Sequence, residues 1–269
     1  MITSIDALIA KARRFTNKHH MVFKGTVWRD THRRLKRLIK SDDIILDIGS
    51  LEAPYTKYMS NTCFALDLPV TGRFGFSYDT LEELRANNKN INPLFATADA
   101  LPFKDQAFDV VICTEVLEHI HNDESAISEI SRVLTTEGQL FLTTPNGDVV
   151  ALEHGIAEHV RHYSKEALNG LLAKYFAKVH IEKRFWLYHQ LNVQYRLRES
   201  FSKHSLQIWL FVMALISSYI YDVIYFVESL LGRGRYNLVA TCSRPRKQRP
   251  SLYSWNPKQG STKENLLAS

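Results

Sequence analysis

Three aspartates lie close to short apolar runs in the sequence. Asp47 and Gly49 follow the run Ile44–Leu46, Asp67 lies near the end of the run "CFALDL", and Asp99 lies ahead of the run "FDVVICT". If these runs are strands of an open α/β sheet, ligands bind at their carboxyl ends. There Asp67 can accept hydrogen bonds from two ribose hydroxyls, each contributing roughly 1.5–3 kcal/mol. Asp99 can accept a hydrogen bond from an adenine amino group.

The turn after the first run, "DIGSLEAPY", contains a single glycine. A dinucleotide-binding turn has three glycines, and a phosphate-binding loop has a glycine-rich arc that ends in Lys-Ser/Thr. Neither pattern is present. The set of acids therefore suits an adenosine with one ribose and no pyrophosphate, and the predicted cofactor is S-adenosylmethionine, which needs no phosphate cradle.

The elements that must position these residues alternate between strands and helices. Apolar runs of strand length are separated by segments whose apolar residues recur at helical spacing. This order predicts a doubly wound, mostly parallel α/β sheet. The predicted strands are 43–48, 63–68, 108–114, 138–145, 178–185 and 236–243, and the predicted helices are 123–134 and 164–176, the latter capped by Ser164.

Four segments together resemble the class I S-adenosylmethionine-dependent methyltransferases, and most closely their methyltransferase type 11-like branch. They are "LDIGSLEAPY", "ADALPFKDQAFDVVICTEVLEHI", "SRVLTTEGQLFLTTPN" and "EHVRHYS". The resemblance covers about Ile44 to Phe176, and Tyr236 to Cys242 supplies a last strand. It implies a Rossmann-like sheet with a final antiparallel strand, a helical insertion before that strand, and a methyl-transfer activity of the EC 2.1.1 type.

The resemblance also implies which residues hold the cofactor. The first loop approaches the methionine part, Asp67 holds the ribose, the Asp99 segment frames the adenine, and the end of the third strand lies under the cofactor. The implied set is Asp47, Gly49, Ser50, Asp67, Leu68, Asp99, Ala100, Leu101, Thr114 and Glu115. Where the family has Cys-Gly-x-Gly, this chain has Ser50 to Ala53. We therefore expect the loop to approach the ligand less closely, and a weakened site is the alternative.

Histidines that follow the third and fourth predicted strands supply candidate bases. An oxygen acceptor needs a base near neutral pH, and His is the usual one. His159 in "EHVRHYS" is the first choice and His119 the second. The alternative is that both orient loops through backbone hydrogen bonds. Glu115, Glu118 and His119 form an E-x-x-E-H cluster, which we interpret as helix-cap and cofactor-shell residues. No metal site is predicted, and a divalent ion is the less favoured alternative.

Charge is concentrated at the two ends of the chain. The net charge is +6, yet residues 1–40 hold eleven Lys/Arg against two acids, and residues 241–269 hold six against one, so the middle is acidic. Basic ends suit an anionic membrane surface or nucleic acid. The three cysteines show no metal-binding spacing, and the first residues lack the apolar core of a signal peptide. These features predict a reduced, cytoplasmic setting.

The most apolar segment is 206–231, which the sequence predicts to be an amphipathic helix lying flat in a membrane interface, flanked by Arg and Lys. The alternative is a core helix or a homodimer interface. The predicted domain organisation is an N-terminal helical arm (1–40), a methyltransferase domain (41–242) with a hydrophobic helical insertion at about 187–234, and a disordered basic tail (243–269).

The sequence thus favours a methyltransferase that acts on a membrane-associated, lipid-linked or glycan-type small molecule, in the cytoplasm or at the inner face of the membrane. An RNA methyltransferase is one alternative, although no Asn/Asp-Pro-Pro-Tyr segment or aromatic-rich RNA-binding module is present, so nucleic acid is not the expected partner. A non-catalytic scaffold that retains the fold is the other.

Overall fold

The computed structural model describes residues 26–51, 53–69, 77–148, 152, 159–184 and 237–246. The chain divides into two compact units, Ile39–Arg184 with Tyr236–Ser269, and Met1–Leu38 with Phe185–Arg235. Of the second unit, only helix α3 (Thr26–Leu38) is described. That helix lies inside the predicted N-terminal arm. The rest of the arm, the predicted insertion with its apolar segment 206–231, and residues 247–269 of the predicted tail lie outside the described residues. The start of that predicted disordered tail was wrong, because Ser243 to Pro245 form the end of the last strand, Asn237–Pro245.

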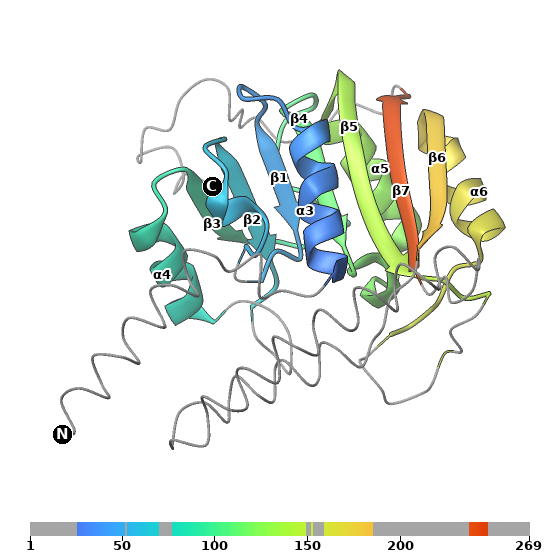
Figure 1. Cartoon of the computed structure of the whole chain (residues 1–269), viewed down its shortest axis with the longest axis horizontal. Helices are drawn as coiled ribbons and strands as arrows, with labels where there is room; N and C mark the ends of the chain where they lie inside the picture. The colour runs from blue at the N-terminus through green and yellow to red at the C-terminus, as the bar shows by residue number, and fades with distance from the viewer. Residues whose placement is uncertain are drawn as a thin grey trace. The chain divides into compact units, whose positions relative to one another are not determined.

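The larger unit is built on a seven-stranded sheet with the order β3-β2-β1-β4-β5-β7-β6 (Figure 1). Strands β1 to β5 pair in parallel, whereas β7 runs antiparallel to both β5 and β6. This topology confirms the predicted doubly wound, mostly parallel sheet with a final antiparallel strand. The strands are β1 (Ile45–Ile48), β2 (Cys63–Asp67), β3 (Ile91–Phe95), β4 (Phe108–Thr114), β5 (Leu134–Pro145), β6 (Phe176–Arg184) and β7 (Asn237–Pro245).

Helices join and cover these strands. They are α4 (Tyr78–Asn87), α5 (Asp123–Val133) and α6 (Lys165–Tyr175), with the short 3₁₀ turns η1 (Thr56–Tyr58) and η2 (Leu117–His119). In Figure 1, α5 is seen behind β5 and β7, and α6 lies at the β6 edge. Each helix has a polar N-cap: Ser77, Asn122 and Ser164 accept a hydrogen bond from the backbone N–H three residues on.

The central strands are buried because they carry apolar side chains on both faces, as expected for parallel strands covered on both sides. All four residues of β1 and all five of β2 are buried. Beside them, Phe64, Phe103 and Phe108 meet edge to face with ring centroids 4.8–5.9 Å apart. This aromatic cluster packs Phe103, in the loop between β3 and β4, against the amino-terminal parts of β2 and β4, at the opposite end of these strands from Asp67 and Thr114.

Several elements differ from the sequence prediction. Helix α4 and strand β3 were not predicted, and β5 begins at Leu134, four residues before the predicted start. Strand β3 contains Pro93, which removes a hydrogen-bond donor and is tolerated because β3 is an edge strand. No helix within the described ranges has the length and apolar character needed to cross a membrane.

Candidate active site

Strand β1 brings the first predicted acid into the protein interior. The Asp47 side chain is only 2% exposed, and its Oδ2 accepts a hydrogen bond of 2.8 Å from the Thr56 hydroxyl. Burial is the main cause that raises the Asp47 pKa to about 7; the hydrogen bond from Thr56 opposes the shift, and the neighbouring Asp67 adds to it. Thr56 was not predicted from the sequence, because it lies nine residues further on, in η1, and reaches Asp47 only through the fold.

The loop after β1 keeps an unusual backbone. Gly49 has a φ of +65°, and a Cβ added there would lie 2.2 Å from the Val116 Cγ2, so only glycine fits. Leu51 and Ala53 also have positive φ, 46° and 48°. These are the two positions at which the family has glycine. The backbone therefore adopts the left-handed conformation that glycines would adopt, and what the substitutions add is side-chain volume, with Leu51 44% exposed.

Strand β2 ends in the acid predicted to hold a ribose. The two oxygens of Asp67 each accept a backbone hydrogen bond, Oδ2 from the Leu51 N–H (2.9 Å) and Oδ1 from the Leu68 N–H (2.8 Å). These bonds fix the carboxylate while each oxygen keeps a further lone pair. Burial raises the Asp67 pKa, and the two backbone N–H groups oppose that shift. Leu68 is 49% exposed beside it.

The predicted adenine segment, Asp99 to Leu101, forms a tight turn. Asp99 and Ala100 are exposed, a bridge pairs Thr97 with Ala100, and Leu101 is buried. The Leu101 N–H donates to Glu129 Oε2 of α5 at 2.8 Å. This hydrogen bond anchors the turn to helix α5. The sequence did not indicate a connection between that helix and the site.

Arg132 completes that anchor. Its side chain is 5% exposed and pairs with Glu129 (2.7 Å) and Asp105 (2.9 Å). It also donates to the carbonyl oxygens of Leu101 (3.1 Å) and Phe103 (2.8 Å). One guanidinium therefore crosslinks α5 to the whole loop between β3 and β4. The only signal in the sequence was a Glu and an Arg three residues apart on a helix, which is too common to predict the contact.

The end of β4 carries Thr114 and Glu115. Glu115 has a φ of 54°, and its Oε1 accepts hydrogen bonds from the Thr143 hydroxyl (2.6 Å) and the Asn237 amide (2.8 Å). Burial raises the Glu115 pKa to about 7. Asn237 was missed, although a polar residue at the start of an apolar strand was a usable signal: in the register of β5 with β7 it lies opposite Pro145.

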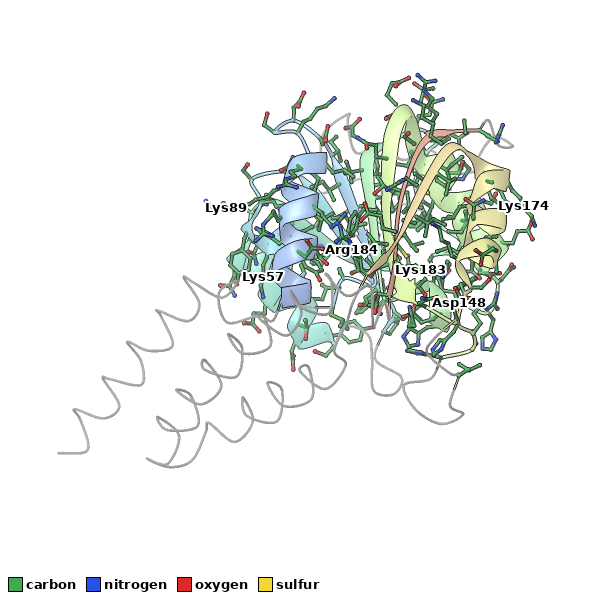
Figure 2. All side chains as sticks on the ribbon, turned by 45° about the vertical axis from the view of Figure 1, so that its right-hand side comes forward. Lys57, Lys89, Asp148, Lys174, Lys183 and Arg184 are labelled. Atoms are coloured by element: carbon green, nitrogen blue, oxygen red, sulfur yellow. The ribbon has the colours of Figure 1, made fainter. Side chains whose placement is uncertain are left out.

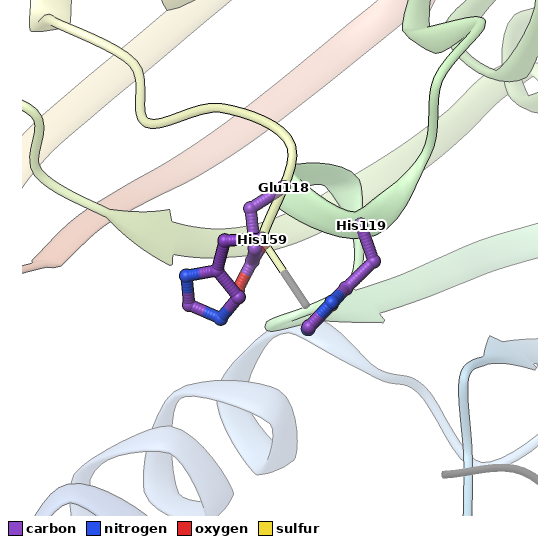
Figure 3. Close-up of side chains that lie close together, drawn as sticks. All are labelled: Glu118, His119 and His159. Carbon is purple, nitrogen blue, oxygen red and sulfur yellow. The ribbon is translucent and has the colours of Figure 1, made fainter. Parts of the chain in front are cut away.

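A second buried acid lies three residues further on, in η2. Glu118 is fully buried, and its Oε2 accepts a hydrogen bond of 3.0 Å from the Thr144 hydroxyl. Burial raises the Glu118 pKa well above its usual range, and Glu115 raises it further. Glu118, His119 and His159 lie close together (Figure 3), with metal-binding atoms all within 4.8 Å of one another.

The two candidate bases are in direct contact. The His119 and His159 rings meet edge to face with centroids 4.6 Å apart, and His159 Nδ1 lies 2.7 Å from His162 Nε2. Burial, together with His119 and His162, lowers the His159 pKa to about 4. At neutral pH His159 is therefore an uncharged imidazole, which can accept a proton or coordinate a cation.

The segment that carries His159 is fastened to η2 and α5. The Val160 N–H donates to the Glu118 carbonyl at 2.9 Å, and Arg161 donates to the His121 carbonyl at 2.6 Å and pairs with Asp123. The Tyr163 hydroxyl donates to the same Asp123 carboxylate at 2.6 Å. His159 is thus brought to His119, forty residues earlier in the chain, by contacts that lie outside the candidate site.

The loop after β5 is also tied down near this segment. The Gly147 N–H donates to the Tyr163 carbonyl at 2.7 Å. Lys183 of β6 pairs with Asp148 at 2.7 Å, and Figure 2 labels both side chains. This ion pair is partly exposed and contributes little stability by itself. Together the two contacts hold the loop after β5 beside Tyr163, at the end of the His159 segment, and beside β6.

Acid side chains dominate the electrostatics of the site. Burial is the first cause of a raised pKa for Asp47, Asp67, Glu115 and Glu118. Three of the four, Asp47, Glu115 and Glu118, also raise the pKa of the buried Cys113 thiol, so they lie around one point. Among the described residues none of the four carboxylates forms an ion pair. Such a site favours a cationic ligand.

A sheet of this order, with acids at the adjacent ends of β1 and β2, defines the fold of the class I S-adenosylmethionine-dependent methyltransferases. Residues 46–142 match the family model described as "Methyltransferase domain". Residues 46–142 therefore carry a methyltransferase domain, and the sheet has the fold of the class I S-adenosylmethionine-dependent methyltransferases. This confirms the family indicated by the sequence, and the cofactor after which the family is named agrees with the one predicted from the acids.

Similar proteins include a probable S-adenosylmethionine-dependent methyltransferase of Mycolicibacterium smegmatis, 32% identical over 27% of this chain and 29% of the relative. A ubiquinone biosynthesis O-methyltransferase of Rickettsia akari is 35% identical over 28% of this chain and 31% of the relative. Haemonchus contortus phosphoethanolamine N-methyltransferase 2, solved with S-adenosylmethionine, has a TM-score of 0.56 at 16% identity, covering 80% of this chain and 52% of that one. At this identity the structural likeness shows the fold alone.

The matches to curated relatives are partial. They span between 21% and 49% of the relatives' own lengths. The activity and substrate of the whole protein are therefore matters for proposal.

Proposed function

We propose that this protein is an S-adenosylmethionine-dependent methyltransferase that acts on a membrane-associated, lipid-linked or glycan-type small molecule. The observation that supports it most is the group of buried acids at the carboxyl ends of β1, β2 and β4, where none of the four described carboxylates has a basic partner. S-Adenosylmethionine carries a sulfonium and an ammonium group, and it supplies an activated methyl group when bound. Buried carboxylates without basic partners suit that charge.

Asp67 suits the ribose. Its two oxygens are held apart and oriented by the Leu51 and Leu68 N–H groups, so an incoming diol finds a carboxylate already in place. Leu51 and Leu68, whose backbone N–H groups bond this carboxylate, have exposed side chains that would offer apolar surface to a base or a sugar. The turn at Asp99 to Leu101, anchored by Glu129, would frame the adenine.

An oxygen acceptor is favoured because two imidazoles, His119 and His159, lie together beyond the end of β4. His159 is uncharged at neutral pH and could accept the proton of an acceptor hydroxyl. The Rickettsia akari relative is an O-methyltransferase of ubiquinone biosynthesis. A lipid-soluble acceptor also fits the apolar segment 206–231 and its basic flanks.

Calorimetry on the full chain tests the cofactor. Asp67→Ala should weaken S-adenosylmethionine binding by about tenfold or more, because charged hydrogen bonds to the ribose are lost. Asp42→Ala removes an exposed acid ahead of β1 and should leave the affinity unchanged. Equal affinity in both variants would refute the role of Asp67. No binding by the unmutated chain would favour the scaffold alternative.

Vesicle flotation tests the membrane contact. We expect the chain to float with anionic vesicles in a salt-sensitive manner, since each cation near such a surface contributes ~1 kcal/mol. Ile220→Glu combined with Val227→Glu should release it while cofactor binding is retained. A double variant that floats as before would refute the flat-helix proposal, and a double variant that changes from dimer to monomer would favour the homodimer. Transfer of a labelled methyl group to a lipid extract, and not to RNA, should accompany flotation.

A further inference from the structure

Glu118, His119 and His159 bring three potential metal ligands within 4.8 Å of one another. We propose that they bind a divalent first-row transition metal ion, and that an oxygen atom of the acceptor takes one of its open coordination positions. This reverses the interpretation of the E-x-x-E-H segment as helix-cap and cofactor-shell residues. The reversal rests on His159, which the sequence did not place beside the other two.

Glu118 is the strongest indication of a ligand. Its side chain is fully buried, and its Oε1 has no hydrogen-bond partner among the described residues. A buried carboxylate oxygen without a partner costs several kcal/mol unless something compensates it. The other oxygen accepts from the Thr144 hydroxyl at 3.0 Å. One oxygen is therefore oriented by the protein and the other is left for a ligand, as in carboxylates that bind metals.

The two imidazoles complete the ligand set. His159 Nδ1 lies 2.7 Å from His162 Nε2, so a tautomer with the proton on Nδ1 donates to His162 and leaves Nε2 of His159 for an ion. Metal-binding histidines are commonly oriented in this way through their second nitrogen. The His119 and His159 rings already meet at 4.6 Å (Figure 3). Without a cation between them, the contact of two imidazoles and a carboxylate would contribute little to the stability of the fold.

The surrounding structure holds the three ligands in place before any ion arrives. Glu118 and His119 come from the single turn η2, and the Val160 N–H bonds the Glu118 carbonyl at 2.9 Å. Arg161 and Tyr163 then fasten the same segment to Asp123. Ligand atoms bound to one tetrahedral ion lie roughly 3–3.5 Å apart. Shifts of the ligand atoms by about 1 Å through side-chain rotation would therefore bring them to this spacing, with no movement of the backbone.

The ligand types select the kind of ion. Two imidazoles and one carboxylate suit Zn²⁺, Fe²⁺ or Co²⁺, whereas Mg²⁺ and Ca²⁺ prefer oxygen ligands alone. Three protein ligands leave at least one coordination position open, which is the arrangement of catalytic and not of structural sites. A bound ion at an open position lowers the pKa of a coordinated hydroxyl, so the ion would replace His159 as the group that activates the acceptor. The role at the acceptor rests on the proposed function, but the binding of the ion does not.

The test is metal binding by the full chain after removal of ions with a chelator. Calorimetry with ZnCl₂ should give one site per chain, and CoCl₂ should give visible absorption bands that Zn²⁺ abolishes. Glu118→Gln keeps the size of the side chain and its contact with Thr144, and it should weaken Zn²⁺ binding at least tenfold, as should His159→Ala. The matched control is His121→Ala, which removes an exposed histidine two residues from His119 and should bind Zn²⁺ as the unmutated chain does.

S-Adenosylmethionine affinity measured on the same samples separates this proposal from the proposed function. His159→Ala should retain cofactor binding while it loses Zn²⁺, because His159 is not one of the acids assigned to the cofactor. The metal site is refuted if the folded, unmutated chain binds no Zn²⁺, or if Glu118→Gln and His159→Ala both bind it with unchanged affinity and stoichiometry. Displacement of Zn²⁺ by an equal concentration of Mg²⁺ would refute a site built on imidazoles.

Discussion

The left-handed backbone at Leu51 allows a direct test of the loop after β1. Leu51 has a φ of 46°, and for a residue with a Cβ this conformation costs ~1–2 kcal/mol. Leu51→Gly removes that cost. It also removes the partial burial of a side chain that is 44% exposed, and it adds the entropy of a glycine in the unfolded chain, about 0.5–1 kcal/mol. These effects oppose one another, so the single variant would be ambiguous.

Leu68→Gly resolves the ambiguity because Leu68 is a matched position. It is 49% exposed, its N–H donates to the same Asp67 carboxylate, and its φ is not positive. Both variants lose similar burial and gain similar entropy in the unfolded state. The difference between them should therefore equal the left-handed cost alone. We expect Leu51→Gly to be more stable than Leu68→Gly by ~1–2 kcal/mol.

Urea unfolding of the two variants, followed by circular dichroism with a common slope, measures this difference. Thermal unfolding should agree, with a separation of roughly 2–8 °C for a domain of this size. If Leu51→Gly is as unstable as Leu68→Gly or less stable, the loop does not adopt the left-handed conformation at Leu51. The chain would then not retain the backbone of the family's glycine loop.

Two further predictions concern buried charges. Arg132→Leu leaves two carboxylates and two carbonyl oxygens without their donor and should lower the free energy of unfolding by about 3–5 kcal/mol. The control Lys174→Leu, at an exposed ion pair, should lower it by under ~1 kcal/mol. Equal losses of the two variants in urea unfolding would contradict the crosslink by Arg132. The Asp47 pKa is raised from 3.8 to about 7 in the folded chain, so Asp47 binds its proton more tightly in the folded than in the unfolded state. The stability that this proton contributes is therefore present at pH 4 and is lost as the pH rises to 7. Asp47→Asn should flatten this fall in unfolding free energy between pH 4 and pH 7, and a variant with the same pH dependence would show that Asp47 titrates normally.

Most strands of the sheet were predictable because they are short apolar runs, each followed by an acidic residue or a turn. Strand β4, for example, has the predicted bounds of 108–114. Strand β3 was missed because Pro93 lies inside it, and proline argues against a strand unless the strand is known to be at an edge. Whether a strand lies at an edge depends on the order of strands in the sheet. That order, in which β3 pairs only with β2, is set by the fold and could not be predicted from the sequence of β3.

The candidate site was predictable up to the residues that adjoin these strands. Asp47, Asp67 and Glu115 follow from their places at strand ends. Their partners do not, since Thr56 and Asn237 reach the acids only through the fold. The same limit applies to His159. Its type marked it as a candidate base, but its contact with His119 depends on backbone hydrogen bonds between segments forty residues apart.

The loop from Ser50 to Ala53 shows why loss of a sequence pattern need not mean loss of a site. Glycines there serve two purposes, which are to permit positive φ and to leave room for a ligand. In this chain positive φ survives at Leu51 and Ala53, and the Leu51 N–H still donates to Asp67. The geometry that orients the ribose-binding acid is therefore kept. The room that a glycine would leave is not kept, because Leu51 adds to the loop a side chain that is 44% exposed. A change in how closely a ligand approaches is the expected consequence, with the position of Asp67 unaltered.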